Sequence, residues 1–478
     1  MVNEFGRKHR VAVLGGGPGG YEAALAGAQL GAEVTLVERR GVGGSAVLTD
    51  VVPSKTLIAT AEAASTVRGA SDLGIRLGDE VRPARPITAE DITVDLRAVN
   101  ERLLRLAAAQ SEDMERELER AGVRIVRGEG RLDGPERVVV SSGSTGGSDE
   151  LEIDADTIVI ATGARPRELP SAKPDGERIL TWTQLYSLGE LPEHLIVVGS
   201  GVTGAEFASA YRNLGARVTL ISSRERVLPG EDVDAALVLE SVFAKIGLEV
   251  LGKSRADRVE RVGDGVRVTL ADGRTVDGSH CLMAVGSIPN TQGIGLEEAG
   301  VLLAESGHIR VNRVAGTSVP SIYAAGDCSD FLPLASVASM QGRTAVFHAM
   351  GDVVSPTELR NVTANVFTQP EIATVGWQQP QVEAGTVRGV IFKLPLAPNA
   401  RAKMQGIEDG FVKLFATTTT RQVLGGVVVA PKASELILPI SIAVEHRLTV
   451  DELAQAFSVY PSLSGAITDA ARAMHIVR

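Results

Sequence analysis

The stretch Val11-Ala12-Val13-Leu14-Gly15-Gly16-Gly17-Pro18-Gly19-Gly20 determines how the rest of the chain is interpreted. Its first four residues form a short apolar run, rich in β-branched side chains and followed by glycines, which predicts a buried strand. Residues 21–31 follow an alanine-rich helical pattern, and residues 32–37 predict a second strand that ends at Glu38. The segment therefore predicts a strand–loop–helix–strand unit whose loop carries the GxGxxG pattern.

This loop has the spacing of a dinucleotide-binding site. Gly15 permits the tight turn, Gly17 lets a pyrophosphate approach the backbone, and Gly20 lets the helix pack closely on the sheet. Glu38 follows the last glycine by 18 residues, where an acid accepts a hydrogen bond from a ribose hydroxyl. We expect the unpaired N–H groups at the start of the helix to face the phosphates.

The same unit occurs again in the middle of the chain. Residues 195–198 predict a strand, residues 205–214 a helix and residues 217–221 the next strand. The loop between the first strand and the helix carries the glycines of a second GxGxxG pattern, Gly199, Gly201 and Gly204. Two dinucleotide sites in one chain predict a flavin nucleotide together with a nicotinamide nucleotide.

The second unit ends without an acid. Ser222, Ser223 and Arg224 stand where the first unit has Glu38. An acid would repel a 2′-phosphate, whereas hydroxyls and a guanidinium can bind it. This difference favours NADPH over NADH as the nicotinamide substrate.

Two further segments belong to the predicted flavin site. Residues 157–160 predict a buried strand running into Thr162 and Gly163, and residues 322–325 predict another that ends at Asp327. An acid at the carboxyl end of a parallel strand lies where such sheets bind ligands, so we expect Asp327 to hold the ribityl chain. Leu334 and Ala335 open a helical stretch to about residue 350, whose N-terminus would stabilise an anionic flavin.

Length and composition exclude several classes of protein. The 478 residues suggest about three domains, and the 44% apolar and 22% charged residues are those of a globular chain. A net charge of −11 without a basic block argues against nucleic acid, and no apolar run reaches the ~18 residues of a membrane span. A chain of this size needs no disulfide or metal to fold. Two cysteines fit a reducing cytoplasm.

The last 120 or so residues show a different pattern. Short alternating strands are predicted at 365–368, 374–376, 387–395, 410–416 and 423–429, and helices at 434–445 and 451–456. This is an α+β unit without a nucleotide signature, and such units commonly serve association. The polar run at 141–150 predicts a turn or loop within the first domain.

In this order, the segments resemble the pyridine nucleotide-disulfide oxidoreductases, which include dihydrolipoamide dehydrogenase. The resemblance covers essentially the whole chain and includes Pro53-Ser54-Lys55, Gly293-Ile294-Gly295-Leu296-Glu297, Phe367-Thr368-Gln369-Pro370-Glu371 and Pro461-Ser462-Leu463-Ser464. It implies an α/β fold with two Rossmann-like domains and a C-terminal α+β dimerisation domain. It implies an FAD-binding and central domain at 1–165 and 289–357, an NAD(P)-binding domain at 166–288 and a dimerisation domain at 358–478. It also implies further cofactor contacts at Gly44, Ser45 and Gly286.

The departures from the family pattern concern its dithiol chemistry. The two cysteines that the family carries before Pro-Ser-Lys fall here on Ala46 and Val51, and its C-terminal histidine and glutamate fall on Tyr460 and Gly465. Cys281 and Cys328 have no spacing that would replace the lost pair. The chain is therefore not expected to reduce disulfides.

The resemblance does imply that flavin reduction is retained. Lys55 and Glu206 match the lysine–glutamate pair that the family places beside the flavin, so both are candidate catalytic residues. Without a disulfide, electrons must pass to a diffusing acceptor, and the branch that matches is the NAD(P)H-quinone reductases. In this interpretation Tyr460 donates a hydrogen bond or proton to the quinone across a homodimer interface.

Two other functions stay open at this stage. Soluble pyridine nucleotide transhydrogenase has the same fold, a partial loss of the disulfide and a Tyr-Pro near its C-terminus. A flavin-binding redox sensor that no longer turns over would also explain the missing cysteines. The retained Lys55 and Glu206 argue moderately against the sensor.

Overall fold

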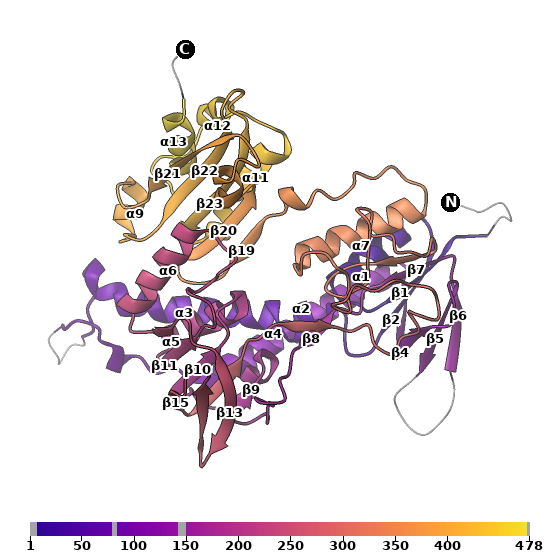
Figure 1. Cartoon of the computed structure of the whole chain (residues 1–478), viewed down its shortest axis with the longest axis horizontal. Helices are drawn as coiled ribbons and strands as arrows, with labels where there is room; N and C mark the ends of the chain where they lie inside the picture. Colours follow the sequence, from indigo (N-terminus) through magenta and orange to yellow (C-terminus); the bar gives the residue numbers. More distant parts are fainter. Residues whose placement is uncertain (1–6, 79–83, 142–149, 476–478) are drawn as a thin grey trace. The chain divides into compact units, whose positions relative to one another are not determined.

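A computed structural model describes residues 7–78, 84–141 and 150–475 (Figure 1). The chain forms two compact units. Unit 1 comprises residues 1–56, 100–167 and 286–358, and unit 2 comprises residues 57–99, 168–285 and 359–478. The helices α3 (Val51–Gly69) and α4 (Leu96–Arg120) carry the chain from one unit to the other.

Unit 1 is built on a five-stranded parallel sheet with the order β18-β7-β1-β2-β3. Its strands are β1 (Arg10–Leu14), β2 (Glu33–Glu38), β3 (Arg124–Arg127), β7 (Thr157–Ile160) and β18 (Ile322–Ala324). The predicted strand–helix–strand unit is confirmed, with α1 at Pro18–Gln29. The strand predicted at 157–160 is β7, and the helix predicted after Leu334 is α7 (Ala335–Ala349).

Alternation along the strands gives the sheet of unit 1 two buried faces. On one face, Val11 and Val13 pack with α1 and α7, which lie side by side in Figure 1. On the other, Ala12 and Leu14 pack with an antiparallel sheet of β4 (Glu129–Leu132), β5 (Arg137–Ser141) and β6 (Glu150–Asp154). Of the polar run predicted as a loop at 141–150, Ser141 ends β5 and Glu150 begins β6, and residues 142–149 lie outside the described residues.

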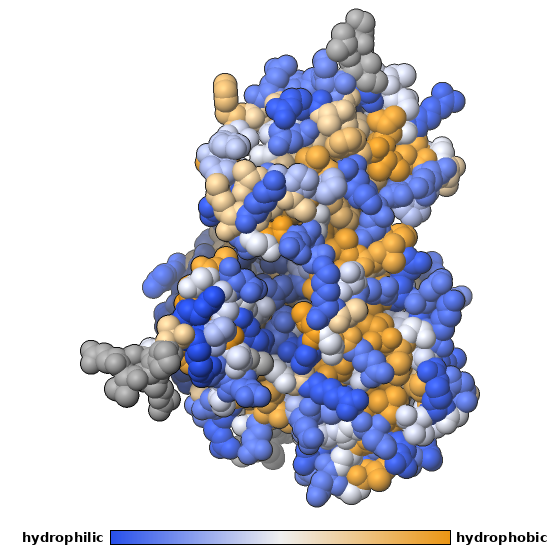
Figure 2. Space-filling model, turned by 90° about the vertical axis from the view of Figure 1, so that its left-hand side faces the viewer, coloured by the Kyte–Doolittle hydropathy of each residue, from blue (hydrophilic) through white to orange (hydrophobic). Residues whose placement is uncertain are grey.

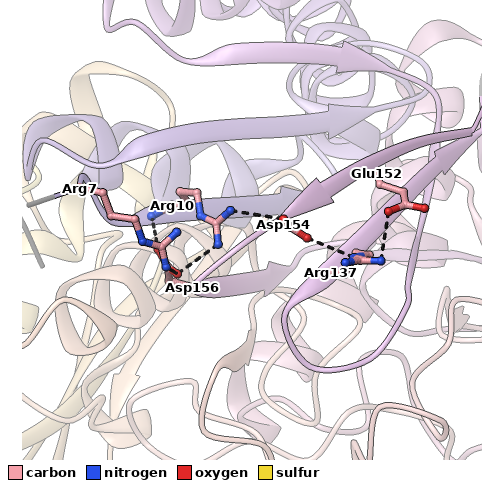
Figure 3. Close-up of polar contacts among 6 residues, drawn as sticks. All are labelled: Arg7, Arg10, Arg137, Glu152, Asp154 and Asp156. Carbon is pink, nitrogen blue, oxygen red and sulfur yellow. Dashed lines mark hydrogen bonds and ion pairs between the residues drawn. The ribbon is translucent and has the colours of Figure 1, made fainter. Parts of the chain in front are cut away.

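The amino end of β1 is fastened to β5 and β6 by a chain of alternating charges (Figure 3). The Arg10 guanidinium lies 3.4 Å from Asp156 and 3.6 Å from Asp154, and the Arg10 N–H donates to Asp156 at 2.9 Å. Arg137 continues the chain by pairing with Asp154 at 3.1 Å. The remaining pairs are Arg7–Asp156 and Arg137–Glu152. Because most of these side chains are exposed, the network contributes little to stability.

Unit 2 contains a second five-stranded parallel sheet with the order β12-β11-β10-β16-β9. Its strands are β9 (Ile179–Leu180), β10 (His194–Val198), β11 (Arg217–Ile221), β12 (Glu249–Leu251) and β16 (His280–Met283). The second predicted unit is confirmed, with α5 (Val202–Leu214) between β10 and β11. Helix α6 (Val233–Lys245) and the antiparallel strands β13 (Ala256–Val262), β14 (Gly265–Leu270) and β15 (Thr275–Gly278) follow.

The C-terminal part of unit 2 is an antiparallel sheet with the order β19-β20-β23-β22-β21. These strands confirm the predicted α+β pattern, at β19 (Ala364–Val366), β20 (Glu371–Gly376), β21 (Gly389–Pro395), β22 (Phe411–Thr417) and β23 (Val423–Ala430). Its helices are α8 (Gln379–Glu383), α9 (Ala400–Met404), α10 (Ala433–Leu436), α11 (Leu438–Glu445), α12 (Val450–Gln455) and α13 (Gly465–Ala473).

One predicted helix of this domain is wrong in its extent. The single helix expected at 434–445 is divided into α10 and α11 at Ile437. Pro439 is the physical reason, because proline lacks the backbone N–H that a continuous helix would need and fits in the first turn of a new one.

Short elements complete both units. They are α2 (Gly44–Leu48), β8 (Ala164–Pro166), β17 (Ser287–Pro289), and the 3-10 turns η1 (Ala70–Leu73), η2 (Ala89–Asp91), η3 (Trp182–Ser187) and η4 (Leu359–Asn361). Strands β8 and β17 pair antiparallel within unit 1. No helix in the described part of the chain is long and apolar enough to cross a membrane.

Candidate functional site

The first glycine loop is shaped so that a phosphate can reach its backbone. Gly15 has φ +97°, and a Cβ there would lie 2.3 Å from the Ala161 carbonyl oxygen. A Cβ on Gly20 would lie 1.8 Å from the Gly15 carbonyl oxygen, so this residue lets α1 sit close to the loop. A Cβ on Gly17 would meet nothing within 4 Å, and no side chain caps α1. The open backbone and uncapped N–H groups fit a pyrophosphate.

This loop opens into a cavity of about 710 Å³ formed by residues of unit 1. Most residues predicted for the flavin site line it, namely Gly15, Gly17, Glu38, Gly44, Ser45, Thr162, Gly163, Asp327 and Ala335. Gly20, Lys55 and Leu334 do not line its wall. Leu334 occupies the N-cap position of α7 without a capping side-chain hydrogen bond. Lys55 lies one helical turn beyond Val51, which does line the cavity.

Glu38 is a buried carboxylate at the end of β2. Its Oε2 accepts a hydrogen bond from the Gly16 N–H at 2.7 Å, and its Oε1 accepts from Arg40 at 2.7 Å and Gly41 at 3.3 Å. These three backbone donors fix the carboxylate on the cavity wall. Because a carboxylate has about four acceptor positions, capacity remains for a ribose hydroxyl.

Asp327 also lines the cavity, just after β18. Burial raises the pKa of its carboxyl above the ordinary value, and the nearby His308 opposes this shift. Gly326, with φ +82°, makes the turn that brings Asp327 to the cavity, and its N–H donates to Gln341 at 2.9 Å. A desolvated carboxyl at this position would gain from the hydroxyl donors of a bound ligand.

Neither position of the family's redox disulfide carries sulfur, and both line the cavity. Ala46 lies in α2 and Val51 begins α3. Gly44, at the start of α2, packs so closely on Gly17 that a Cβ would lie 2.8 Å from the Gly17 Cα. The segment 44–51 therefore brings a methyl and an isopropyl group to the wall that also carries the glycine loop.

The two cysteines of the chain are free and buried. The Cys328 thiol donates to the carbonyl oxygens of Ile160 at 3.5 Å and Ala325 at 3.4 Å, and burial raises its pKa to about 11. Burial also raises the pKa of the Cys281 thiol. Both thiols are therefore protonated at neutral pH and unsuited to nucleophilic or redox exchange.

The second glycine loop, in unit 2, repeats the geometry of the first. Gly199 has φ +112°, and a Cβ there would lie 2.1 Å from the Ala284 carbonyl oxygen. A Cβ on Gly204 would lie 1.8 Å from the Gly199 carbonyl oxygen, whereas one on Gly201 would meet nothing within 4 Å. Helix α5 likewise begins without a side-chain cap. This loop fits a second pyrophosphate for the same reasons as the first.

The end of β11 differs from the end of β2 in the way its turn is held. The Ser222 hydroxyl is fully buried and lies 2.7 Å from the Ser200 hydroxyl, so a pair of hydroxyls replaces the contact between Gly16 and Glu38. The Arg224 N–H also donates to the Ser222 hydroxyl at 3.1 Å, while the side chains of Ser223 and Arg224 are exposed. Sequence reasoning missed Ser200, although its position next to Gly199 matches that of Gly16.

Glu206, in the second turn of α5, is 3% exposed. Its Oε1 accepts a hydrogen bond from the Phe367 N–H at 2.8 Å, a contact that sequence reasoning did not find. Gly286 precedes β17 with φ +90°, and a Cβ there would meet nothing within 4 Å.

Tyr460 lies in an exposed apolar segment before α13. Its side chain is 86% exposed, and Phe457 and Val459 beside it are exposed as well. Figure 2 shows apolar side chains at the surface of this C-terminal domain. The described residues contain no group of three or more histidine, cysteine or acidic side chains that could hold a metal ion.

Comparison with known proteins identifies the family. Residues 9–342 match the Pyridine nucleotide-disulphide oxidoreductase family, and residues 362–471 match its dimerisation domain. The chain belongs to this family. Its members use FAD and a pyridine nucleotide, which agrees with the two loops described above.

Individual relatives support the same assignment. A protein of Mycobacterium tuberculosis named NAD(P)H dehydrogenase (quinone) is 53% identical over 470 residues, covering 97% of this chain and 93% of the relative. Dihydrolipoyl dehydrogenase of Geobacillus stearothermophilus is 32% identical and covers 98% and 97%. The crystal structure of LpdA from Mycobacterium tuberculosis has a TM-score of 0.91 at 50% identity, covering 98% of this chain and 100% of that one. The predicted family and its NAD(P)H-quinone reductase branch are therefore confirmed.

Proposed function

We propose that the protein is an FAD-dependent NAD(P)H dehydrogenase (quinone) that works without a redox-active disulfide. The observation that carries this proposal is the cavity of unit 1, where Ala46 and Val51 share a wall with the dinucleotide loop. The relative that is 53% identical bears the name of this activity. A flavin site whose neighbouring wall lacks sulfur has to deliver its electrons to a diffusing acceptor.

Different residues of the cavity would bind different parts of FAD. The backbone at Gly15 and Gly17 and the start of α1 would bind the pyrophosphate. Glu38, held by three backbone donors, would accept a ribose hydroxyl, and the desolvated carboxyl of Asp327 would take the hydroxyls of the ribityl chain. Thr162 and Gly163 at the end of β7 would complete the wall.

When bound, FAD would supply the chemistry that accepts a hydride from the reduced nicotinamide and passes two electrons to the acceptor. Lys55 would stabilise the negative charge that reduction places on the ring system, and Glu206 would fix the lysine and offset the burial of its charge. Glu206 is suited to this task because it is nearly fully buried and anchored by a backbone N–H.

We assign the nicotinamide nucleotide to the second glycine loop, with NADPH preferred. The buried Ser222 hydroxyl leaves no negative charge at the end of β11. The exposed Ser223 and Arg224 would then be free to bind a 2′-phosphate. In this arrangement residues 1–165 and 289–357 bind FAD, residues 166–288 bind NAD(P)H, and residues 358–478 form the dimerisation domain.

The acceptor we propose is a planar quinone. The methyl and isopropyl groups of Ala46 and Val51 offer it an apolar wall. A second copy of the chain would cover the exposed segment around Tyr460. The Tyr460 phenol of one subunit would then donate a proton to the oxygen of the quinone bound by the other subunit. A cytoplasmic location is supported by the two free thiols.

The stoichiometry of anaerobic reduction tests this proposal. One equivalent of NADPH should bleach the flavin completely, because the protein stores two electrons, and menadione should restore its colour at a rate that supports turnover. A need for two equivalents would reveal a second redox centre and contradict the proposal. A bleached flavin that only an oxidised nicotinamide nucleotide reoxidises would instead favour the transhydrogenase, and one that no acceptor reoxidises would favour the sensor.

A further inference from the structure

One face of α5 forms a row of hydrogen bonds with the segment 367–369 of the C-terminal domain, and both lie in unit 2. Glu206, Ser209 and Asn213 follow one another at helical spacing and therefore share a face. All three are at most 7% exposed. The Phe367 N–H donates to the Glu206 carboxylate, as described above. The Gln369 N–H donates to the Ser209 hydroxyl at 3.3 Å, and the Asn213 amide donates to the Gln369 side-chain oxygen at 2.9 Å.

The segment 367–369 is itself held firmly in place. The Thr368 hydroxyl, 1% exposed, donates to the Pro370 carbonyl oxygen at 2.7 Å. The next residue, Glu371, begins β20 and accepts a hydrogen bond from the Ser434 N–H at 2.8 Å. The segment thus points two backbone donors, the N–H groups of Phe367 and Gln369 on either side of Thr368, towards the face of α5.

From this arrangement we propose that Asn213 and Gln369 are positioning residues that hold the Phe367 N–H on the Glu206 carboxylate. The proposal rests on the proposed role of Glu206 beside Lys55. A buried carboxylate depends strongly on each donor it has, and a hydrogen bond to a charged group is stronger than one between neutral groups. The bonds at Ser209 and Asn213 keep the donor in register with the carboxylate, although neither of these two residues carries charge.

The assignment predicts that Asn213 and Gln369 act on flavin reduction only through Glu206. Gln369→Met keeps the side-chain length but removes the acceptor, and Asn213→Ala removes the donor. Each variant should lower the rate of flavin reduction by NADPH about tenfold and shift the midpoint potential of the bound flavin to more negative values. A double-mutant cycle with Glu206→Gln decides the mechanism, because residues that act through a shared group are not additive.

In the Glu206→Gln background, adding Gln369→Met should change the reduction rate and the potential less than twofold. Equal effects in both backgrounds, or no effect of Gln369→Met and Asn213→Ala in the wild-type background, would overturn the proposal. Lys245→Met is the matched control, because it also breaks a contact of the C-terminal domain, the ion pair between Lys245 in α6 and Asp409 at 2.7 Å. It should leave both readouts unchanged.

Thermal unfolding of each variant shows that a slower reduction is not a loss of fold. The cycle measures flavin reduction and needs no quinone, so its result is separate from the choice of acceptor. A wild-type protein that fails to reduce menadione while the cycle remains non-additive would refute the proposed function and leave the positioning role intact.

Discussion

Replacing Lys413 by methionine should destabilise the protein far more than the loss of an ordinary ion pair. Lys413 in β22 is 1% exposed, and its ammonium lies 2.7 Å from both carboxylate oxygens of Asp232. It also contacts Asp234 at 2.8 Å and the side-chain oxygen of Gln379 at 2.6 Å, and lies 5.4 Å from the centre of the Phe411 ring. All these residues belong to unit 2.

The size of the effect follows from what the substitution leaves behind. The Asp232 side chain is fully buried in the intact pair and caps α6 by accepting from the Ala235 N–H at 3.2 Å. Without the lysine it becomes an uncompensated buried charge, which typically costs about 3–5 kcal/mol. The loss of Lys413 should destabilise the Asp234 carboxylate less, because Lys393 still pairs with it. Burial tends to raise its pKa, but hydrogen bonds from Lys413 and then Lys393 hold that pKa below the ordinary value.

Thermal unfolding at neutral pH measures this effect. For a unit of this size, about 2 °C per kcal/mol converts the loss into a fall of about 6–10 °C in the apparent Tm. Lys245→Met removes an exposed pair instead, and should cost less than about 1 kcal/mol. Adding Asp232→Asn to Lys413→Met should restore part of the stability. The reasoning would be refuted if Lys413→Met unfolded within 2 °C of the Lys245→Met control.

Three further outcomes are expected. Gly17→Ala should fold normally yet bind FAD at least tenfold more weakly in equilibrium dialysis, because its Cβ enters only the open space at the loop. Gly20→Ala should instead lower the apparent Tm, because its Cβ meets a carbonyl oxygen at 1.8 Å. Equal losses of Tm in the two variants would contradict this prediction. Asp327→Asn should stabilise the FAD-free protein at pH 8 and weaken FAD binding. Burial raises the pKa of this carboxyl, so its ionisation costs stability at high pH, and the gain should shrink towards pH 4; a pH-independent difference in Tm would count against it. A thiol reagent should modify neither cysteine in the folded protein and both after unfolding; rapid labelling of the native state would show that the burial argument fails.

The sequence predicts well those features that are local in the chain. Both glycine loops could be placed because a strand, three glycines and a helix follow one another within about 20 residues. Helix α4 was missed although Leu103, Ala107 and Leu118 share its buried face. Leu104 and Leu106 are exposed on the same helix, so its apolar residues do not mark a single face in the sequence.

Contacts between distant segments could not be predicted in this way. The Lys413–Asp232 pair joins residues 181 positions apart, and the Phe367–Glu206 bond joins residues 161 positions apart. Neither residue pair has a local signature, since a lysine in a strand or a glutamate in a helix is usually exposed. The Ser200–Ser222 pair is intermediate, because only the alignment of the second loop with the first reveals it.

Steady-state turnover with a panel of acceptors tests the central claim most directly. The FAD-loaded protein is supplied with NADPH, or with NADH in parallel, and offered menadione, a lipoamide disulfide or a thio-analogue of NAD⁺. The account predicts rapid menadione reduction, no lipoamide reduction and a faster rate with NADPH. Reduction of lipoamide, or reduction of the nicotinamide analogue faster than the quinone, would contradict it.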